Sequence, residues 1–307
     1  MPATSTTTLD KPMKKLGFHI VKLWVDFLSI HPFWLLYLKS DCYFVLLYYL
    51  ARYRRKVVRQ NLLRSFPGKD EKAVKAIERR FYHNLCDLFV ESPKMLRMGP
   101  KGYRKRIIFT NPGLVKELYE RQKNIFYAIP HSGNWEWFGK LIPELTPHNG
   151  LAVYKRVKND VFERLMLYMR TKDCRLEMVE SNSVLRRLVQ LRDKQNGVLM
   201  MADQTSFGHD SDYWTTFLHQ DTCWFTGIER IAKKLDYAVV FVSMVRKGRG
   251  RFEVTFETVC DNPKEATDGQ IMEQYVRCVE RFINENPDNW LWSHRRWKHH
   301  RPQKSES

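Results

Sequence analysis

The chain has 307 residues, of which 43% are hydrophobic and 28% are charged. This composition is typical of a folded protein with a sizeable core and contains too many charges for a polytopic membrane protein. Lysine and arginine outnumber aspartate and glutamate by 52 to 34, and the net charge of +18 favours nucleic acid, anionic lipid or an acidic protein as a partner. The six cysteines form no C-x-x-C pair, so the sequence predicts neither a metal site nor a redox motif.

Residues 1–12 and 302–307 are poor in apolar side chains, and we expect both segments to be tails. The first dozen residues also lack the apolar core of a signal peptide.

Residues 16–50 are the most apolar and aromatic part of the chain. Charged residues interrupt them, so no stretch approaches the roughly 20 apolar residues that a membrane-spanning helix needs. His31-Pro32 predicts a bend. We therefore interpret residues 13–60 as a membrane-associated helical anchor, built on a helix pair that lies in one leaflet. A hairpin packed on the protein's own core and a single tilted spanning helix remain alternatives.

A basic cluster follows this segment directly, consisting of Arg52, Arg54, Arg55, Lys56 and Arg59. Basic residues at the end of an apolar segment are typical of proteins that bind anionic, cytoplasmic membrane surfaces. The alternative is a solvated face of an ordinary helix.

Residues 70–98 have the apolar spacing of an amphipathic helix. Beyond residue 122, short apolar runs alternate with helical patterns. The expected strands are 124–130, 150–154, 197–202, 237–245 and 251–258, and the expected helices are 135–142, 159–172, 183–194, 226–235 and 267–286. This alternation predicts an α/β fold with a mixed, largely parallel sheet flanked by helices. We place the main domain at residues 61–301, with its catalytic core beginning near residue 100.

His131-Ser-Gly-Asn-Trp-Glu136 lies where an apolar run ends and a helical pattern begins. In open α/β sheets, ligands bind beyond the carboxyl ends of the strands, so His131 is expected in a cleft. Glu136, in the first turn of the helix, is predicted to accept the imidazole N–H and fix the tautomer. Taken alone this spacing is weak, because a capping carboxylate and a structural histidine would produce it too.

The sequence resembles the late lipid A acyltransferases, the lauroyl and myristoyl transferases of Gram-negative bacteria. The resemblance covers nearly the whole chain, and its segments occur in the same order. The matching segments are Tyr53 to Pro67, Phe81 to Asn84, His131 to Glu136, Val153 to Arg156 with Arg170, Met201 to Gln204, and Trp290 to Lys298. The resemblance implies a glycerol-phosphate-acyltransferase-like fold. It also implies transfer of an acyl chain from an acyl-carrier-protein thioester, with no cofactor, to a hydroxyl of a lipid A precursor at the inner membrane.

Within this resemblance each matched residue has an expected role. His131 is the general base, Glu136 orients it, and Arg170 stabilises the oxyanion ahead of the Ser132 and Gly133 amides. The expected substrate-binding residues are Tyr154, Lys155, Arg156, Asp203, Gln204, His294, Arg295 and Arg296, with the basic ones on phosphates of the lipid. His294 has an equally good interpretation as a core or membrane-contact residue.

Alternative functions remain at this point. The same chemistry suits an aminolipid, a phosphatidylinositol mannoside or a lysophospholipid. Nucleic-acid binding, which the charge would allow, is disfavoured because no nucleic-acid motif is present. The acyl length, the acceptor hydroxyl and the oligomeric state are not determined by the sequence.

Overall fold

A computed structural model of the protein describes residues 10–205 and 213–301. The segments 1–9 and 302–307 of the two expected tails lie outside the described residues. Helix α1 (Asp10–Ile30) begins within the segment 1–12 that the sequence predicts as tail.

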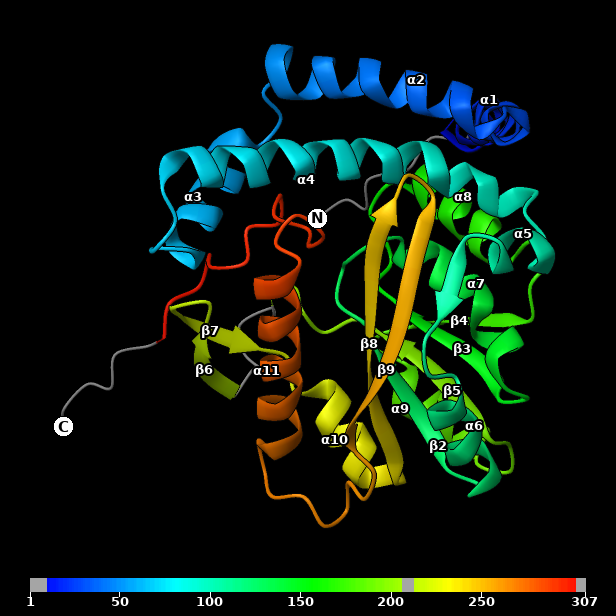
Figure 1. The fold of residues 1–307 in the computed structure, drawn as a ribbon. Helices are drawn as coiled ribbons and strands as arrows, with labels where there is room; N and C mark the ends of the chain where they lie inside the picture. The colour runs from blue at the N-terminus through cyan, green and yellow to red at the C-terminus, as the bar shows by residue number, and fades with distance from the viewer. Residues whose placement is uncertain (1–9, 206–212, 302–307) are drawn as a thin grey trace, which may run out of the picture.

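The N-terminal region is helical and covers one end of the molecule (Figure 1). Helix α1 ends at Ile30 and α2 (Phe33–Phe44) begins immediately after Pro32, which confirms the predicted break at His31-Pro32. The chain then continues through a π-helical turn, η1 (Val45–Leu50), and α3 (Arg55–Ser65) into the long helix α4 (Glu71–Glu91). Helix α2 packs along α4, and α1 packs on the short segment η2 (Ser92–Leu96) and on α8 (Asp160–Thr171).

The core is a seven-stranded sheet in the order β1-β9-β8-β2-β5-β3-β4. Neighbours pair in parallel except β8 and β9, which form an antiparallel hairpin. The strands are β1 (Ile107–Phe109), β2 (Asn124–Ala128), β3 (Asn149–Tyr154), β4 (Leu176–Glu180), β5 (Asn196–Met200), β8 (Tyr237–Gly248) and β9 (Arg251–Cys260). A separate antiparallel pair consists of β6 (Tyr213–Phe217) and β7 (Gln220–Trp224).

Helices cover both faces of the sheet, as alternate residues of β2 show. Phe126 and Ala128 join a hydrophobic cluster with α3, α4, α9 (Val184–Gln190), α10 (Gly227–Leu235) and α11 (Gln270–Glu285). Ile125 and Tyr127 join a second cluster with α5 (Pro100–Arg104), α6 (Gly113–Glu120), α7 (Trp135–Leu145) and α8. A strand buried on both faces reads as a continuous apolar run, which is why residues 124–130 are so hydrophobic.

The position of β2 determines the position of the site. It lies between β8 and β5 and runs parallel to both, and Ala128 pairs with Met200 near the ends of β2 and β5. The loops that follow these two strands therefore leave the same edge of the sheet side by side.

The mixed, largely parallel sheet and its flanking helices are as the sequence predicts. Strands β1 and β4, helices α5 and α6, and the β6–β7 pair are additional. In the described part of the chain, no helix combines the length and the apolar character that crossing a bilayer requires.

Candidate active site

The loop His131–Asn134 connects β2 to α7. Asn134 caps the helix, because its Oδ1 accepts the Trp137 amide at 3.1 Å. Gly133 has a φ of +58°, and a Cβ at this position would lie 2.6 Å from the Met244 carbonyl oxygen. The loop therefore needs glycine here both for its left-handed backbone and for its close approach to β8.

The segment after α11 holds this loop from the other side. The Gly133 amide donates to the Asn289 carbonyl at 3.2 Å, and the Leu291 amide donates to the His131 carbonyl at 3.1 Å. The Asn289 side chain in turn accepts the Arg246 amide at 2.8 Å. Two parts of the chain that lie far apart in sequence thus fix the backbone around His131.

Asp203, in the loop after β5, is the hydrogen-bond partner of His131. Its Oδ1 lies 2.6 Å from His131 Nδ1, and its Oδ2 accepts the His131 amide at 2.9 Å and the Trp290 indole N–H at 2.8 Å. Burial alone would raise the pKa of Asp203, but the His131 ring and these hydrogen bonds hold the pKa below its usual value. Because an ionised carboxylate can only accept a hydrogen bond, the proton in this contact is on His131 Nδ1.

Glu136 does not orient His131, and that prediction was wrong. Its carboxylate instead accepts two hydrogen bonds from Arg170, from Nε at 2.8 Å and from Nη2 at 2.6 Å. Burial alone would lower the pKa of Arg170, whereas this carboxylate raises it above its usual value. Arg170 and Glu136 therefore form one partly buried ion pair in the pocket wall, separate from the His131–Asp203 pair.

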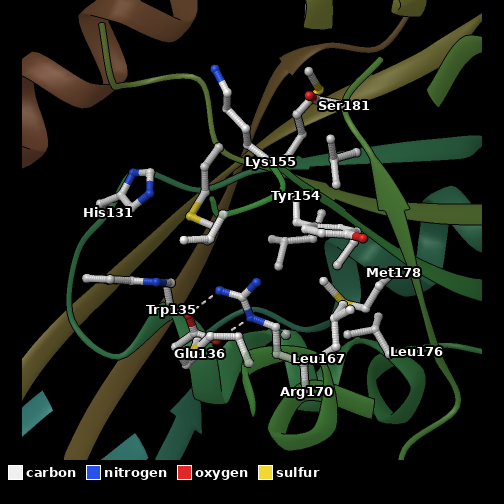
Figure 2. A pocket seen from close by; sticks show the side chains of 18 of the residues that line it. His131, Trp135, Glu136, Tyr154, Lys155, Leu167, Arg170, Leu176, Met178 and Ser181 are labelled. Atoms are coloured by element: carbon white, nitrogen blue, oxygen red, sulfur yellow. Dashed lines mark hydrogen bonds and ion pairs between the residues drawn. The ribbon is translucent and has the colours of Figure 1, made fainter. Parts of the chain in front are cut away.

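A pocket of about 640 Å³ opens beside His131 and Trp135 (Figure 2). The Glu136–Arg170 pair lies along one side of it, and Leu167, Leu176 and Met178 lie farther from His131 (Figure 2). Its remaining apolar lining includes Met95, Val153, Val157, Phe162, Met166, Leu199, Met201 and Phe225. Polar side chains such as Lys140, Glu163 and Thr205 also line the pocket, but most of its lining is apolar, which suits an apolar ligand.

Among the expected substrate-binding residues, Tyr154, Lys155 and Gln204 line this pocket. Asp203 does not line it, because the aspartate is 1% exposed and lies behind the imidazole. Arg156 and Arg295 are on the surface, where Arg156 is 3.8 Å from Asp160.

Arg296 contradicts the expectation of a phosphate ligand. Its side chain is 2% exposed, and its guanidinium lies over the Trp224 ring at 4.4 Å. Burial lowers the pKa of this arginine to about 10. An external phosphate cannot reach a guanidinium enclosed in this way, so Arg296 belongs to the core under the site.

His294 is a structural partner of the same loop cluster. Its Nε2 accepts the Thr205 amide at 3.1 Å, two residues after Asp203. Burial, opposed in part by Asp203, lowers the pKa of His294 to about 4, so the ring is neutral at physiological pH. This contact places His294 beside the Asp203 loop, in agreement with the core interpretation.

Trp290 and Glu91 are two supporting residues that sequence reasoning missed. Glu91, at the end of α4, accepts the Asn134 side-chain amide at 3.0 Å and two hydrogen bonds from Arg246, at 2.9 and 3.0 Å. Trp290 was part of a recognised motif without an assigned role, but nothing in the amphipathic pattern around Glu91 distinguishes it. Within residues 10–205 and 213–301, no three histidine, cysteine or carboxylate side chains are grouped as metal ligands would be.

No curated protein sequence matches the chain at a significant level. The family model for the bacterial lipid A biosynthesis acyltransferases matches residues 11–299, which include the complete sheet, the pocket and the C-terminal segment that holds His131. The chain therefore belongs to the bacterial lipid A biosynthesis acyltransferase family and is an acyltransferase.

Proposed function

We propose that the enzyme transfers a fatty acyl chain from an acyl-carrier-protein thioester to a hydroxyl of a lipid A precursor, as a late acylation step at the cytoplasmic face of the inner membrane. The observation that carries the proposal is the His131–Asp203 pair at the edge of an apolar pocket. The family membership supports the lipid A acceptor.

His131 serves as the general base. Its Nε2 takes the proton from the acceptor hydroxyl as that oxygen attacks the thioester carbonyl carbon. The tetrahedral intermediate collapses with cleavage of the C–S bond, and the imidazolium returns the proton to the departing thiolate. Asp203 keeps the ring in the required tautomer and stabilises the imidazolium, which is the role first assigned to Glu136.

Arg170 is the donor for the oxyanion. A guanidinium has five N–H groups, and Glu136 occupies two of them, so the others remain for the pocket that Arg170 lines. The alternative donors are already engaged, because the Ser132 amide donates to Pro130 at 2.7 Å and the Gly133 amide to Asn289 at 3.2 Å. Glu136 then positions Arg170 rather than His131.

The apolar pocket holds the acyl chain, and the basic protein surface attracts the acidic donor protein. Electrostatic attraction between oppositely charged proteins speeds their encounter and weakens with salt. With subsaturating donor, turnover of acyl carrier protein substrate should therefore fall as ionic strength rises. A rate independent of salt would favour a small thioester such as acyl-CoA.

The outer face of α1, α2 and η1 is the membrane contact. It exposes large apolar side chains, including Leu23, Trp24, Phe27, Ile30, Trp34, Leu38, Leu46 and Leu50. Peripheral insertion of such a face fits helices that are too short or too charged to span. Of the basic cluster that follows, Arg55 and Arg59 pair with the buried Glu78, and Arg54 donates to the Ser293 carbonyl at 3.0 Å. Arg52 and Lys56, which are exposed, are then the members of the cluster that contact anionic lipid.

The test is reconstitution. Purified enzyme is incubated with acyl-carrier-protein thioesters of several acyl chain lengths and with vesicles that contain an underacylated lipid A precursor. The mass of the product is measured by mass spectrometry. A mass gain of one acyl chain that His131→Ala abolishes, while the exposed His300→Ala does not, supports the proposal. Acylation of a phospholipid or aminolipid in place of the lipid A precursor contradicts it.

A further inference from the structure

A second cavity, of about 490 Å³, lies next to the junction of α1 and α2, outside the acyl pocket. Six of its lining residues are Phe33, Lys94, Arg97, Lys105, Arg106 and Arg251, contributed by α2, η2, the region around α5 and the first residue of β9. The lining contains five cationic side chains, and none of its described residues is a carboxylate.

Two of the five cations have a visible structural task. Lys94 Nζ donates to the Ser29 carbonyl at 2.8 Å and the His31 carbonyl at 2.9 Å, and so caps the carboxyl end of α1. Arg106 donates to the Gly250 carbonyl at 3.2 Å and lies 3.4 Å from the centre of the Phe33 ring. Burial, and then the charges of Arg106 and Arg97, lower the pKa of Lys94.

The other three cations, Arg97, Lys105 and Arg251, are exposed at the cavity. The Arg97 side chain donates from Nε to Ser29 Oγ at 3.0 Å. In the described part of the chain none of the five forms an ion pair, whereas other arginines there, such as Arg59, Arg121 and Arg246, do. Gathering five like charges without a counter-ion costs electrostatic free energy, which a bound anion would recover.

The surroundings indicate the source of that anion. Phe33 lines the cavity, while its neighbour Trp34 is 69% exposed and Ile30, at the end of α1, is 62% exposed. The cavity therefore opens at the border of the apolar face assigned to the membrane. At this depth a bilayer presents its head-group phosphates, and arginine is suited to bind them through two parallel N–H groups.

We propose that this cavity is a phosphate-binding site occupied by the head group of an anionic membrane lipid, distinct from the acyl-transfer site. The bound phosphate would fix the depth and tilt at which the apolar face enters the leaflet. The proposal does not depend on the acyl-transfer chemistry, because its readout is binding.

The experiment compares three full-length proteins: the parent, the triple variant R97Q/K105Q/R251Q, and the matched control K116Q/R192Q/K194Q. The control removes the same charge from exposed positions on and near α6 and α9, at the opposite end of the molecule from α1 and α2 (Figure 1). Partitioning is measured by sedimentation with phosphatidylcholine vesicles, with and without phosphatidylglycerol. A separate arm measures the thermal midpoint with inorganic phosphate against chloride at equal ionic strength.

We expect the cavity variant to lose about tenfold or more of its affinity for the phosphatidylglycerol vesicles, with the control near the parent. All three should bind pure phosphatidylcholine vesicles alike. A rise of the thermal midpoint with phosphate in the parent, absent from the cavity variant, supports the site. If the midpoint rises in this way but the two proteins bind the phosphatidylglycerol vesicles equally, the site binds free phosphate in place of lipid.

Equal losses in the two variants, or no loss in either arm, overturn the proposal. If the parent binds no vesicles of any composition, the membrane assignment of the apolar face fails as well. If the parent binds phosphatidylcholine vesicles and the cavity substitutions change neither vesicle binding nor the thermal midpoint, the phosphate site is overturned while the membrane assignment of the apolar face stands.

Discussion

The His131 imidazole and the Asp203 carboxylate are joined by a 2.6 Å contact between Nδ1 and Oδ1, and the same carboxylate holds the His131 amide at 2.9 Å. One side chain thus fixes both the ring and the backbone of the residue that carries it. The arrangement requires the loops after β2 and β5 to be neighbours, which the strand order provides.

Asp203→Asn should reduce turnover by about 10² to 10⁴-fold, comparable with His131→Ala, because an asparagine can leave the ring in the wrong tautomer and cannot stabilise the imidazolium. The rate is measured with acyl thioester and lipid acceptor, and folding is checked by the thermal midpoint. Asp193→Asn, on an exposed aspartate, is the control for the chemical change. An Asp203→Asn protein that folds and retains the parent rate would remove the aspartate from the mechanism.

Breaking the Glu136–Arg170 pair from either side should destabilise the protein, because a charge is left without its partner. The loss should be smaller than the ~3–5 kcal/mol of a fully buried pair, since the Arg170 and Glu136 side chains are 22% and 9% exposed. The double variant Glu136→Gln/Arg170→Gln should recover part of this stability but none of the activity, since the proposed oxyanion donor, Arg170, is still missing. Chemical denaturation of the parent, the two single variants and the double variant gives the coupling free energy between the two side chains.

The surface pair Arg187–Glu177 is the matched control for this cycle, because it has the same 2.6 Å contact with both side chains 38% exposed. Its coupling should be no more than about 1 kcal/mol. Activity in the double variant at the site would exclude Arg170 as the oxyanion donor.

Gly133→Ala should lower both stability and turnover. The added methyl group meets the Met244 carbonyl at 2.6 Å, and the backbone has a φ of +58°, so we expect a cost of at least about 1–2 kcal/mol with displacement of the His131 loop. Gly68→Ala provides the comparison, since a Cβ at Gly68 meets nothing within 4 Å. Equal thermal midpoints for the two variants would mean that the loop tolerates the side chain.

The free energy of unfolding should depend on pH through His294. Burial lowers its pKa from 6.5 to about 4, so between these values the unfolded chain binds a proton that the folded protein does not. Stability therefore rises with pH across this window, is complete above about 6.5, and is lost toward pH 4.

His294→Gln removes this contribution, and the parent should lose on the order of 2 kcal/mol more than the variant between pH 7 and pH 4.5. Denaturation curves at several pH values give the free energy of unfolding of each protein. The contributions of the other histidines cancel in the difference between the parent and the variant. Parallel pH profiles for the two proteins would show that His294 does not titrate on unfolding.

The sequence predicts much of this structure because its strands and helices have clear periods. The apolar run ending at Pro130 and the run ending at Ala202 identify β2 and β5, and they place His131 and Asp203 at one edge of the sheet. Short elements such as β1 and β4 escape prediction, since three to five residues at a sheet edge carry little pattern.

The partner of His131 was harder to predict, because side-chain pairing depends on distances across the fold. The five-residue spacing predicts a hydrogen bond between His131 and Glu136, but Glu136, on α7, pairs with Arg170 on α8. The buried Arg296 was missed for a similar reason: a run of cations reads as surface, and only packing against Trp224 shows otherwise. Glu91 has no local signal, since its four partners come from three other parts of the chain.

The packing of α1 on α8 has a consequence for any attempt to treat the N-terminal helix as a detachable part. The Lys22 ammonium lies 4.6 Å from the centre of the Tyr168 ring, and Arg164 lies 4.9 Å from that of Phe18. Helix α8 also carries Arg170 and part of the lining of the pocket beside His131. Replacing α1 by an unrelated helix would therefore remove these contacts and expose the side of α8 that α1 covers, next to the pocket lining.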